Sequence, residues 1–236
     1  VRDGSAAEYG GGIRTGGRLT LSAVAVVSNT AAIGGGIGSS NTAVVVNAST
    51  IASNTASTAG GGIGAGGGVV IVTGSTLTAN SSAGLSAAGG GAIFGEGSMV
   101  TVIDSTLSFN RASGSYGGGA ILNAGPLTIT GSSLISNTAA LYGEIDGRGG
   151  AVSFVGGNEY TLVISDTSFL SNTAFYAGGA LYVANGTLDL DNSTLASNTA
   201  AGGSELGGAL FCDACGFTVD GTTFTGNQAA QGGAFY

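Results

Sequence analysis

Apolar and polar residues alternate in short stretches along the whole chain. The segments Leu127-Thr-Ile129-Thr and Leu188-Asp-Leu190-Asp are clear examples, and turn-forming residues follow before the next such stretch. A period of two places every second side chain on the same face of a β-strand, whereas a helix repeats every 3.6 residues. Glycine and β-branched residues, which disfavour helices, occur throughout. The pattern therefore predicts an all-β chain of short strands.

These stretches belong to a repeat that is marked by a double glycine. The residues that follow the glycine pair end in an apolar side chain at Ile13, Ile37, Ile63, Ile93, Ile121, Val152, Leu181, Leu210 and Phe235. One asparagine lies between successive glycine pairs, usually within Ser-Asn-Thr-Ala: Asn29, Asn54, Asn80, Asn110, Asn137, Asn172, Asn198 and Asn227. A repeat of 24 to 35 residues predicts a solenoid, propeller or array.

The length of the repeat selects one of these architectures. A propeller blade needs four strands in about 40 to 50 residues, so three short strands per repeat fit better. Stacked rungs of three parallel strands form a β-helix, and the rule for parallel crossovers favours a right-handed coil. We therefore expect a right-handed parallel β-helix of about eight rungs, spaced about 4.8 Å apart. Residues 1–236 would form this single domain, with no helical domain.

The repeated residues have structural roles in such a coil. Inward apolar side chains stack on one another, and the recurring asparagines form an internal ladder of side-chain hydrogen bonds. Glycine pairs suit a tight corner, because glycine adopts positive φ and allows neighbouring backbones to approach. We expect the asparagine column to hold the coil together and not to bind a ligand.

Two motifs of the repeat resemble those of a known family. Gly-Gly-Ala-Ile at 90–93 and 118–121, together with Phe-x-x-Asn at 169–172 and 224–227, is similar to the repeat of polymorphic outer membrane proteins. Those proteins are bacterial surface adhesins whose passenger is a right-handed β-helix. The resemblance implies an extracellular or cell-surface location of bacterial type and an adhesive role.

Composition excludes several other classes of protein. The chain has 236 residues with 48 glycines, 43% hydrophobic residues and a net charge of -8, which argues against disorder. Histidine and lysine are absent, so most general bases, the commonest metal ligand and amine nucleophiles are missing. Five arginines are too few to predict a nucleic-acid partner. No apolar run reaches the roughly 20 residues of a membrane helix. We therefore expect neither an enzyme nor a cofactor.

Insertions accumulate between each repeated asparagine and the next glycine pair. Repeat proteins often place insertions on the face that binds a partner, although polar loops are also ordinary solvated edges. The longest insertion, 138–149, and the loops on nearby rungs carry the candidate binding residues Arg111, Tyr116, Tyr142, Glu144, Asp146, Arg148 and Glu205. Arginine and tyrosine are typical contact residues, so this face would bind a host-surface protein or a glycan.

Two aspartates suggest an alternative function. Asp191 and Asp220 occupy the same column on adjacent rungs, with Asp166 and Asn192 one turn position away. Paired carboxylates serve in glycoside cleavage and bind calcium, but aspartate and asparagine are also ordinary turn formers. A carbohydrate-active enzyme, either a polysaccharide lyase or a glycoside hydrolase, is therefore the alternative, although no arginine lies near this column to serve a lyase.

A column of hydroxyl side chains suggests a further alternative. It contains Thr50, Thr76, Thr106, Ser133, Ser168, Thr194 and Thr223. A flat array of this kind could bind ice. The neighbouring column is irregular, however, and threonine is a common outward residue in strands.

Cys212 and Cys215 form a Cys-x-x-Cys pair. Zinc would need two further ligands, and no other cysteine or histidine is present. The pair therefore predicts a local disulfide, which favours an oxidising, extracellular setting.

Both ends of the sequence lie within glycine-motif strands. Val1 is neither an initiator methionine nor part of a signal peptide, and we expect no polar capping helix at either end. The chain is therefore expected to be a fragment or a processed piece with open strand edges. We expect an extracellular structural or adhesive rod that joins other copies end to end in a filament or belongs to a longer surface passenger.

Overall fold

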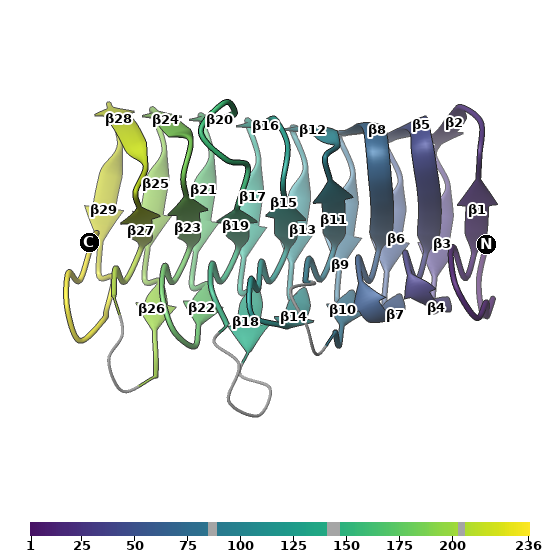
Figure 1. Ribbon diagram of the computed structural model, residues 1–236, viewed down its shortest axis with the longest axis horizontal. Helices are drawn as coiled ribbons and strands as arrows, with labels where there is room; N and C mark the ends of the chain where they lie inside the picture. Colours follow the sequence, from purple (N-terminus) through teal and green to yellow (C-terminus); the bar gives the residue numbers. More distant parts are fainter. Residues whose placement is uncertain (85–88, 141–146, 203–205) are drawn as a thin grey trace.

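The computed structural model describes residues 1–84, 89–140, 147–202 and 206–236. They form a parallel β-solenoid of about seven turns, with three sheets per turn and the two termini at opposite ends of the rod (Figure 1). The described residues contain no helix, and therefore none that could span a membrane. The predicted all-β fold, a parallel coil with three strands per rung, is confirmed, with about seven turns where about eight rungs were expected.

Three sheets run along the rod. The 14-stranded sheet contains β1 (Ile13–Thr15), β2 (Leu19–Ser22), β5 (Ile37–Asn47), β8 (Ile63–Thr73), β11 (Ile93–Glu96), β12 (Met99–Ile103), β15 (Ile121–Asn123), β16 (Leu127–Thr130), β19 (Val152–Phe154), β20 (Thr161–Ser165), β23 (Leu181–Ala184), β24 (Thr187–Asp191), β27 (Leu210–Asp213) and β28 (Gly216–Asp220). The eight-stranded sheet contains β3 (Ala25–Val27), β6 (Thr50–Ala52), β9 (Thr76–Thr78), β13 (Thr106–Ser108), β17 (Ser133–Ile135), β21 (Ser168–Leu170), β25 (Thr194–Ala196) and β29 (Thr223–Thr225). The seven-stranded sheet contains β4 (Thr30–Ile33), β7 (Thr55–Ala59), β10 (Ser81–Ser82), β14 (Arg111–Ser113), β18 (Thr138–Ala140), β22 (Thr173–Ala174) and β26 (Thr199–Ala200).

Equivalent positions of successive repeats lie opposite each other. Ile63 pairs with Ile37 and Ile93, and Leu107 pairs with Leu77 and Leu134, always between parallel strands. The register holds through insertions because the extra residues lie in the connections between strands. Side chains of one column therefore stack along the rod.

One hydrophobic core follows the axis of the coil. The residue three positions before each repeated asparagine points inward and is fully buried at Val26, Ile51, Leu77, Leu107, Leu134, Phe169 and Leu195. Burying one such side chain contributes about 1.5 to 3 kcal/mol. The same column continues to Phe224, which packs against the core from the last turn and is only partly buried.

The corner at the double glycine requires residues without a Cβ. Gly34 has a φ of +64°, and a Cβ on the next residue, Gly35, would overlap the carbonyl oxygen of Thr55 on the following turn. The corner before each asparagine is also left-handed, but there most turns use serine, as at Ser53 with a φ of +55°.

Residues at the beginning of the chain lie against the first turn. Arg2, Ser5 and Tyr9 form isolated parallel bridges with Val27, Thr30 and Ile33. The backbone amide of Gly4 donates to the Oδ1 atom of Asn29 at 2.9 Å.

Candidate functional site

The repeated asparagines form a continuous ladder inside the coil. The Nδ2 atom of Asn137 donates to the Oδ1 atom of Asn172 at 3.0 Å and to the backbone oxygen of Leu107 at 2.9 Å. Its backbone amide donates to the same Oδ1 atom of Asn172 at 2.9 Å. The same contacts link Asn54 to Asn80 and every later neighbour through to Asn227. The predicted ladder is confirmed, and its members satisfy one another.

A second ladder, made of hydroxyl groups, was not predicted. Each member accepts a backbone amide from the previous turn and donates to the backbone oxygen two residues before it. Ser75 Oγ, for example, accepts the amide of Ser49 at 3.0 Å and donates to Thr73 O at 2.9 Å. The members are Ser49, Ser75, Ser105, Ser132, Thr167, Ser193 and Thr222. The signal in the sequence is a hydroxyl residue five positions before each asparagine from Asn54 onward.

The predicted binding face is described only in part. Tyr142, Glu144, Asp146 and Glu205 lie outside the described residues. Arg111, in β14, and Tyr116 are both exposed, Tyr116 to 37%. Arg148 is partly buried, and its backbone oxygen accepts the amide of Gly118 at 2.8 Å.

Arg148 contacts two aromatic rings, those of Tyr176 and Tyr182, which were not predicted from the sequence. Its guanidinium carbon lies 5.2 Å from the ring centre of Tyr176 and 5.2 Å from that of Tyr182. Its Nη1 atom donates to the Tyr182 hydroxyl at 3.0 Å. Cation–π contacts of partly desolvated arginines contribute up to about 2 kcal/mol. The base of the longest insertion is thus fixed to the next turn.

Tyr182 links this arginine to a third turn. Its hydroxyl donates to Asp213 Oδ2 at 3.3 Å, and its ring stacks on Phe211 at 5.5 Å, with an interplanar angle of 5°. Burial raises the pKa of Tyr182 above the ordinary 10.0; the charge of Asp213 raises it too, while that of Arg148 opposes the shift. Phe211 stacks in turn on Tyr236 at 5.7 Å. We call Arg148, Tyr176, Tyr182, Phe211 and Asp213 the corner cluster.

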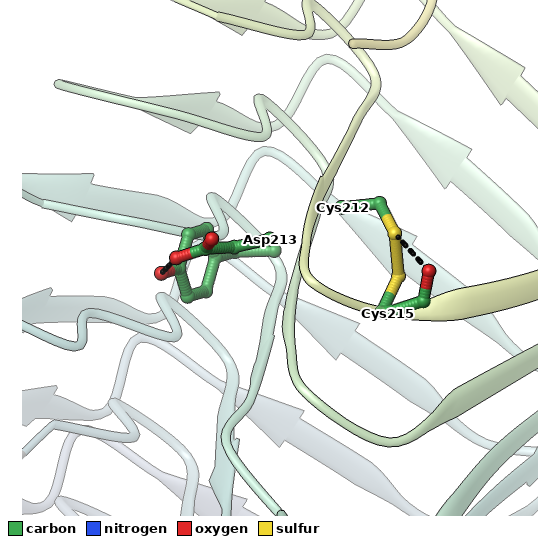
Figure 2. Close-up of a disulfide and its surroundings, with 4 residues drawn as sticks. Cys212, Asp213 and Cys215 are labelled. Carbon is green, nitrogen blue, oxygen red and sulfur yellow. Dashed lines mark hydrogen bonds between the residues drawn. A yellow bond between two sulfur atoms is a disulfide. The ribbon is translucent and has the colours of Figure 1, made fainter. Parts of the chain in front are cut away.

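The two cysteines form a disulfide beside this cluster (Figure 2). Cys212 lies in β27, one residue before the strand ends, and Cys215 directly precedes β28, so the bond closes the turn between the two strands. Ala214 has a φ of +52° within this turn, and the side chain of Asp213 points away from the two sulfur atoms. The predicted disulfide is confirmed.

Asp191 and Asp220 lie in register on β24 and β28. Asp191 Oδ2 accepts the side-chain amide of Asn192 at 3.0 Å, and Asp220 Oδ1 accepts the amide of Gly221 at 3.0 Å. Both carboxylates therefore take part in turn contacts. A cavity of about 330 Å³ lies at the opposite end of the rod, lined by Val1, Arg2, Ala25 and Val27.

The outward hydroxyl column of the eight-stranded sheet is also in register. Thr50 pairs with Thr76, Thr76 with Thr106 and Thr106 with Ser133. In the neighbouring outward column, Ile135 and Leu170 lie opposite each other and interrupt the small side chains. The hydroxyl surface is therefore one column wide at these turns.

Comparisons with protein-family models, curated proteins and solved structures find no match for this chain. Within the described part of the chain, no three cysteine, aspartate or glutamate side chains gather as a metal site would require. The described surface thus offers exposed aromatic and arginine side chains, an outward hydroxyl column and a carboxylate pair. The interior of the rod holds the hydrophobic core and the two hydrogen-bond ladders.

Proposed function

We propose that the chain is an extracellular structural or adhesive rod of the kind found at bacterial surfaces. The observation that carries this proposal is the pair of ladders, which repeat the same hydrogen bonds on nearly every turn. A coil held in this way keeps its shape over its length while its outward side chains vary from turn to turn. The disulfide supports an oxidising setting, and the resemblance to polymorphic outer membrane proteins supports a surface location.

The last turn supports end-to-end joining as one form of this role. Phe217 and Phe235 are each 49% exposed there, although both continue columns that are buried in earlier turns. Phe235 packs edge-on against Phe217 and Phe224, which leaves an apolar surface across the end of the coil. A second copy of the chain would cover this surface and pair with the open strand edges.

The charges at the two ends are complementary. Residues 1–18 contain three arginines, Arg2, Arg14 and Arg18, and two acidic residues. Residues 189–236 contain five acidic residues and no cation. Opposite charges steer association and favour one orientation. The joining we propose is therefore between the first turn of one copy and the last turn of another.

An adhesion assay together with electron microscopy tests the proposal. Beads coated with the purified, disulfide-bonded chain are offered arrays of glycans and of host-surface proteins, and the uncoupled chain is imaged in parallel. We expect retention on at least one arrayed ligand, filaments in the images, or both. Beads carrying the chain unfolded in denaturant are the control. The proposal would be contradicted if the beads were not retained beyond this control and no filaments formed.

The carboxylate pair supports a second candidate, a glycan-cleaving enzyme. Neighbouring strands lie about 4.8 Å apart, and retaining glycosidases hold their two carboxyl groups about 5 to 5.5 Å apart. Asp191 and Asp220 lie on neighbouring strands. Release of reducing sugar from a polysaccharide panel, lost in both Asp191→Asn and Asp220→Asn, would establish this activity. Release by both variants at the level of the wild type would rule out this activity for the carboxylate pair.

A further inference from the structure

The corner before Asn110 differs from the same corner on every other turn. That position is left-handed throughout, and it is occupied by Ser28, Ser53, Ala79, Ser136, Ser171, Ser197 and Gly226 on the other turns. On this turn it is Phe109, with a φ of +56°. A bulky side chain with positive φ is an outlier, and strained residues of this kind cluster at binding sites.

Phe109 is also the most exposed of the large hydrophobic side chains in the described residues. It is 64% exposed, and it takes part in no ring contact with a described aromatic residue. Neither burial nor aromatic stacking accounts for a phenylalanine here. Within the described residues, therefore, neither burial nor a ring contact of Phe109 offsets the backbone strain at this corner.

Two further apolar side chains lie beside it. The backbone amide of Phe109 donates to the oxygen of Ile135 at 3.0 Å, and that of Ser136 donates to Leu170 at 2.9 Å. Ile135 and Leu170 are partly exposed, in a column where the flanking turns carry Ser108 and Ala196. Three successive turns thus place an apolar side chain at the same edge of the eight-stranded sheet.

Arg111 adds a charge on the other side of the corner. Its column in the seven-stranded sheet otherwise holds Thr30, Thr55, Ser81, Thr138, Thr173, Thr199 and, by bridges at its two ends, Ser5 and Gln228. Arg111 is exposed, and no carboxylate of the described residues pairs with it. It is also the single charge between Asp104 and Glu144. A carboxylate on a partner would meet no competing acid from this stretch of the chain.

We infer that Phe109, Ile135, Leu170 and Arg111 form a docking patch for a protein surface that offers an apolar pocket edged by a carboxylate. Buried aromatic and arginine side chains dominate the binding energy of protein interfaces. Glycan recognition would instead call for carboxylate and amide groups beside the ring, whereas this patch presents aliphatic side chains and a cation. The inference rests on the adhesive role proposed above and names the class of partner for it.

A stability measurement separates docking from a structural role. Phe109→Ser introduces the residue that five other turns use at this corner. We expect its melting temperature to equal or exceed that of the wild type, because the strain of the bulky side chain is removed. A lower melting temperature would show that Phe109 supports the fold and would overturn the inference. The matched control is Phe169→Ser in the buried column, which should lower the melting temperature clearly.

The second measurement selects short random displayed peptides on the folded wild-type chain. The variant carrying both Phe109→Ser and Arg111→Thr serves for counter-selection. We expect the recovered peptides to combine carboxylates with aromatic or aliphatic residues and to bind the double variant at least tenfold more weakly. Peptides that bind both proteins equally, or that are basic, would overturn the inference.

Two further outcomes would assign the patch to another occupant and so overturn the inference. One is a glycan-array signal that the wild type gives and the double variant lacks. The other is self-association that the wild type shows and the double variant lacks. The adhesion assay and the images of filaments report on the rod as a whole. A failure of the patch is therefore distinguishable from a failure of the proposed role.

Discussion

One asparagine side chain per turn links each turn of the coil to its neighbours by hydrogen bonds. An amide buried without partners costs roughly 1 to 3 kcal/mol, and Asn137 avoids that cost through bonds to Asn110, Asn172 and Leu107. The requirement is mutual, because each asparagine is both donor and acceptor for its neighbours. A substitution at one turn therefore leaves unsatisfied groups on two others.

Replacement of one ladder residue tests this dependence. Asn137→Leu should lower the free energy of unfolding by about 1 to 3 kcal/mol, since Asn110 loses its acceptor and Asn172 its donor. Thr138→Val, in the next position and outward, should change it far less. Chemical denaturation of both variants gives the comparison. Equal losses would contradict the role of the ladder.

The double-glycine corner gives a second test at the scale of a residue. A Cβ on Gly119 would overlap the carbonyl oxygen of Gly150 on the next turn, whereas a Cβ on Gly17 would meet nothing within 4 Å. Gly119→Ala should therefore destabilise the coil by about 3 kcal/mol, and Gly17→Ala should be nearly neutral. Thermal melts of the pair measure the difference. Similar melting temperatures would show that backbone packing at this corner tolerates a methyl group.

Among the elements, the strands and the core were predictable because they rest on alternation and on a fixed repeat. The asparagine ladder followed from the same repeat, as did the disulfide from the spacing of Cys212 and Cys215. The hydroxyl ladder has a sequence signal five residues before each asparagine from Asn54 onward, but serine and threonine are also ordinary turn residues, so the signal does not distinguish a ladder from a turn.

The corner cluster could not have been predicted from the sequence. Arg148, Tyr182 and Asp213 belong to three different turns, and only the stacking of the turns brings them together. Phe109 was missed for a related reason. The sequence shows a phenylalanine before an asparagine, but not that this corner is left-handed and open to solvent.

The raised pKa of Tyr182 gives the corner cluster a pH dependence. A folded-state pKa above the unfolded value of about 10 means that the folded chain holds the phenolic proton more tightly. This contribution to stability is fully present below pH 10 and is lost as the pH rises through the folded-state pKa. The melting temperature should therefore fall on the alkaline side, and less steeply in Tyr182→Phe. Identical alkaline profiles would contradict this account.

At the scale of the whole molecule, the proposed end-to-end joining depends on the exposed surface of the last turn. Phe235→Asp would place a carboxylate against Phe217 and Phe224, where an uncompensated charge is costly to cover. Light scattering over a concentration series should show growth for the wild type and none for the variant. The far-ultraviolet circular dichroism spectrum is the control. An unchanged spectrum would show that the inner turns of the variant remain folded. A wild-type chain that remains monomeric at high concentration would rule out joining through the ends.

In both ladders, the hydrogen bonds that link one member to the next run from an N–H donor to an oxygen acceptor in the same direction along the rod. The interior of the rod therefore has a polarity from end to end. Each asparagine Nδ2 donates one hydrogen back to a backbone oxygen of the preceding turn, but every amide-to-amide bond runs from Nδ2 to the Oδ1 atom of the next asparagine toward the C-terminal end. Each Oδ1 atom therefore faces the side of Asn29, and the chain of amide-to-amide bonds has its positive, donor end at Asn227. Asp213 and Asp220 lie at the positive end, where negative charge is favoured. Two C-terminal ends would bring donor against donor. A fibre grown from this chain would therefore have two unlike tips, and the two tips would grow at different rates.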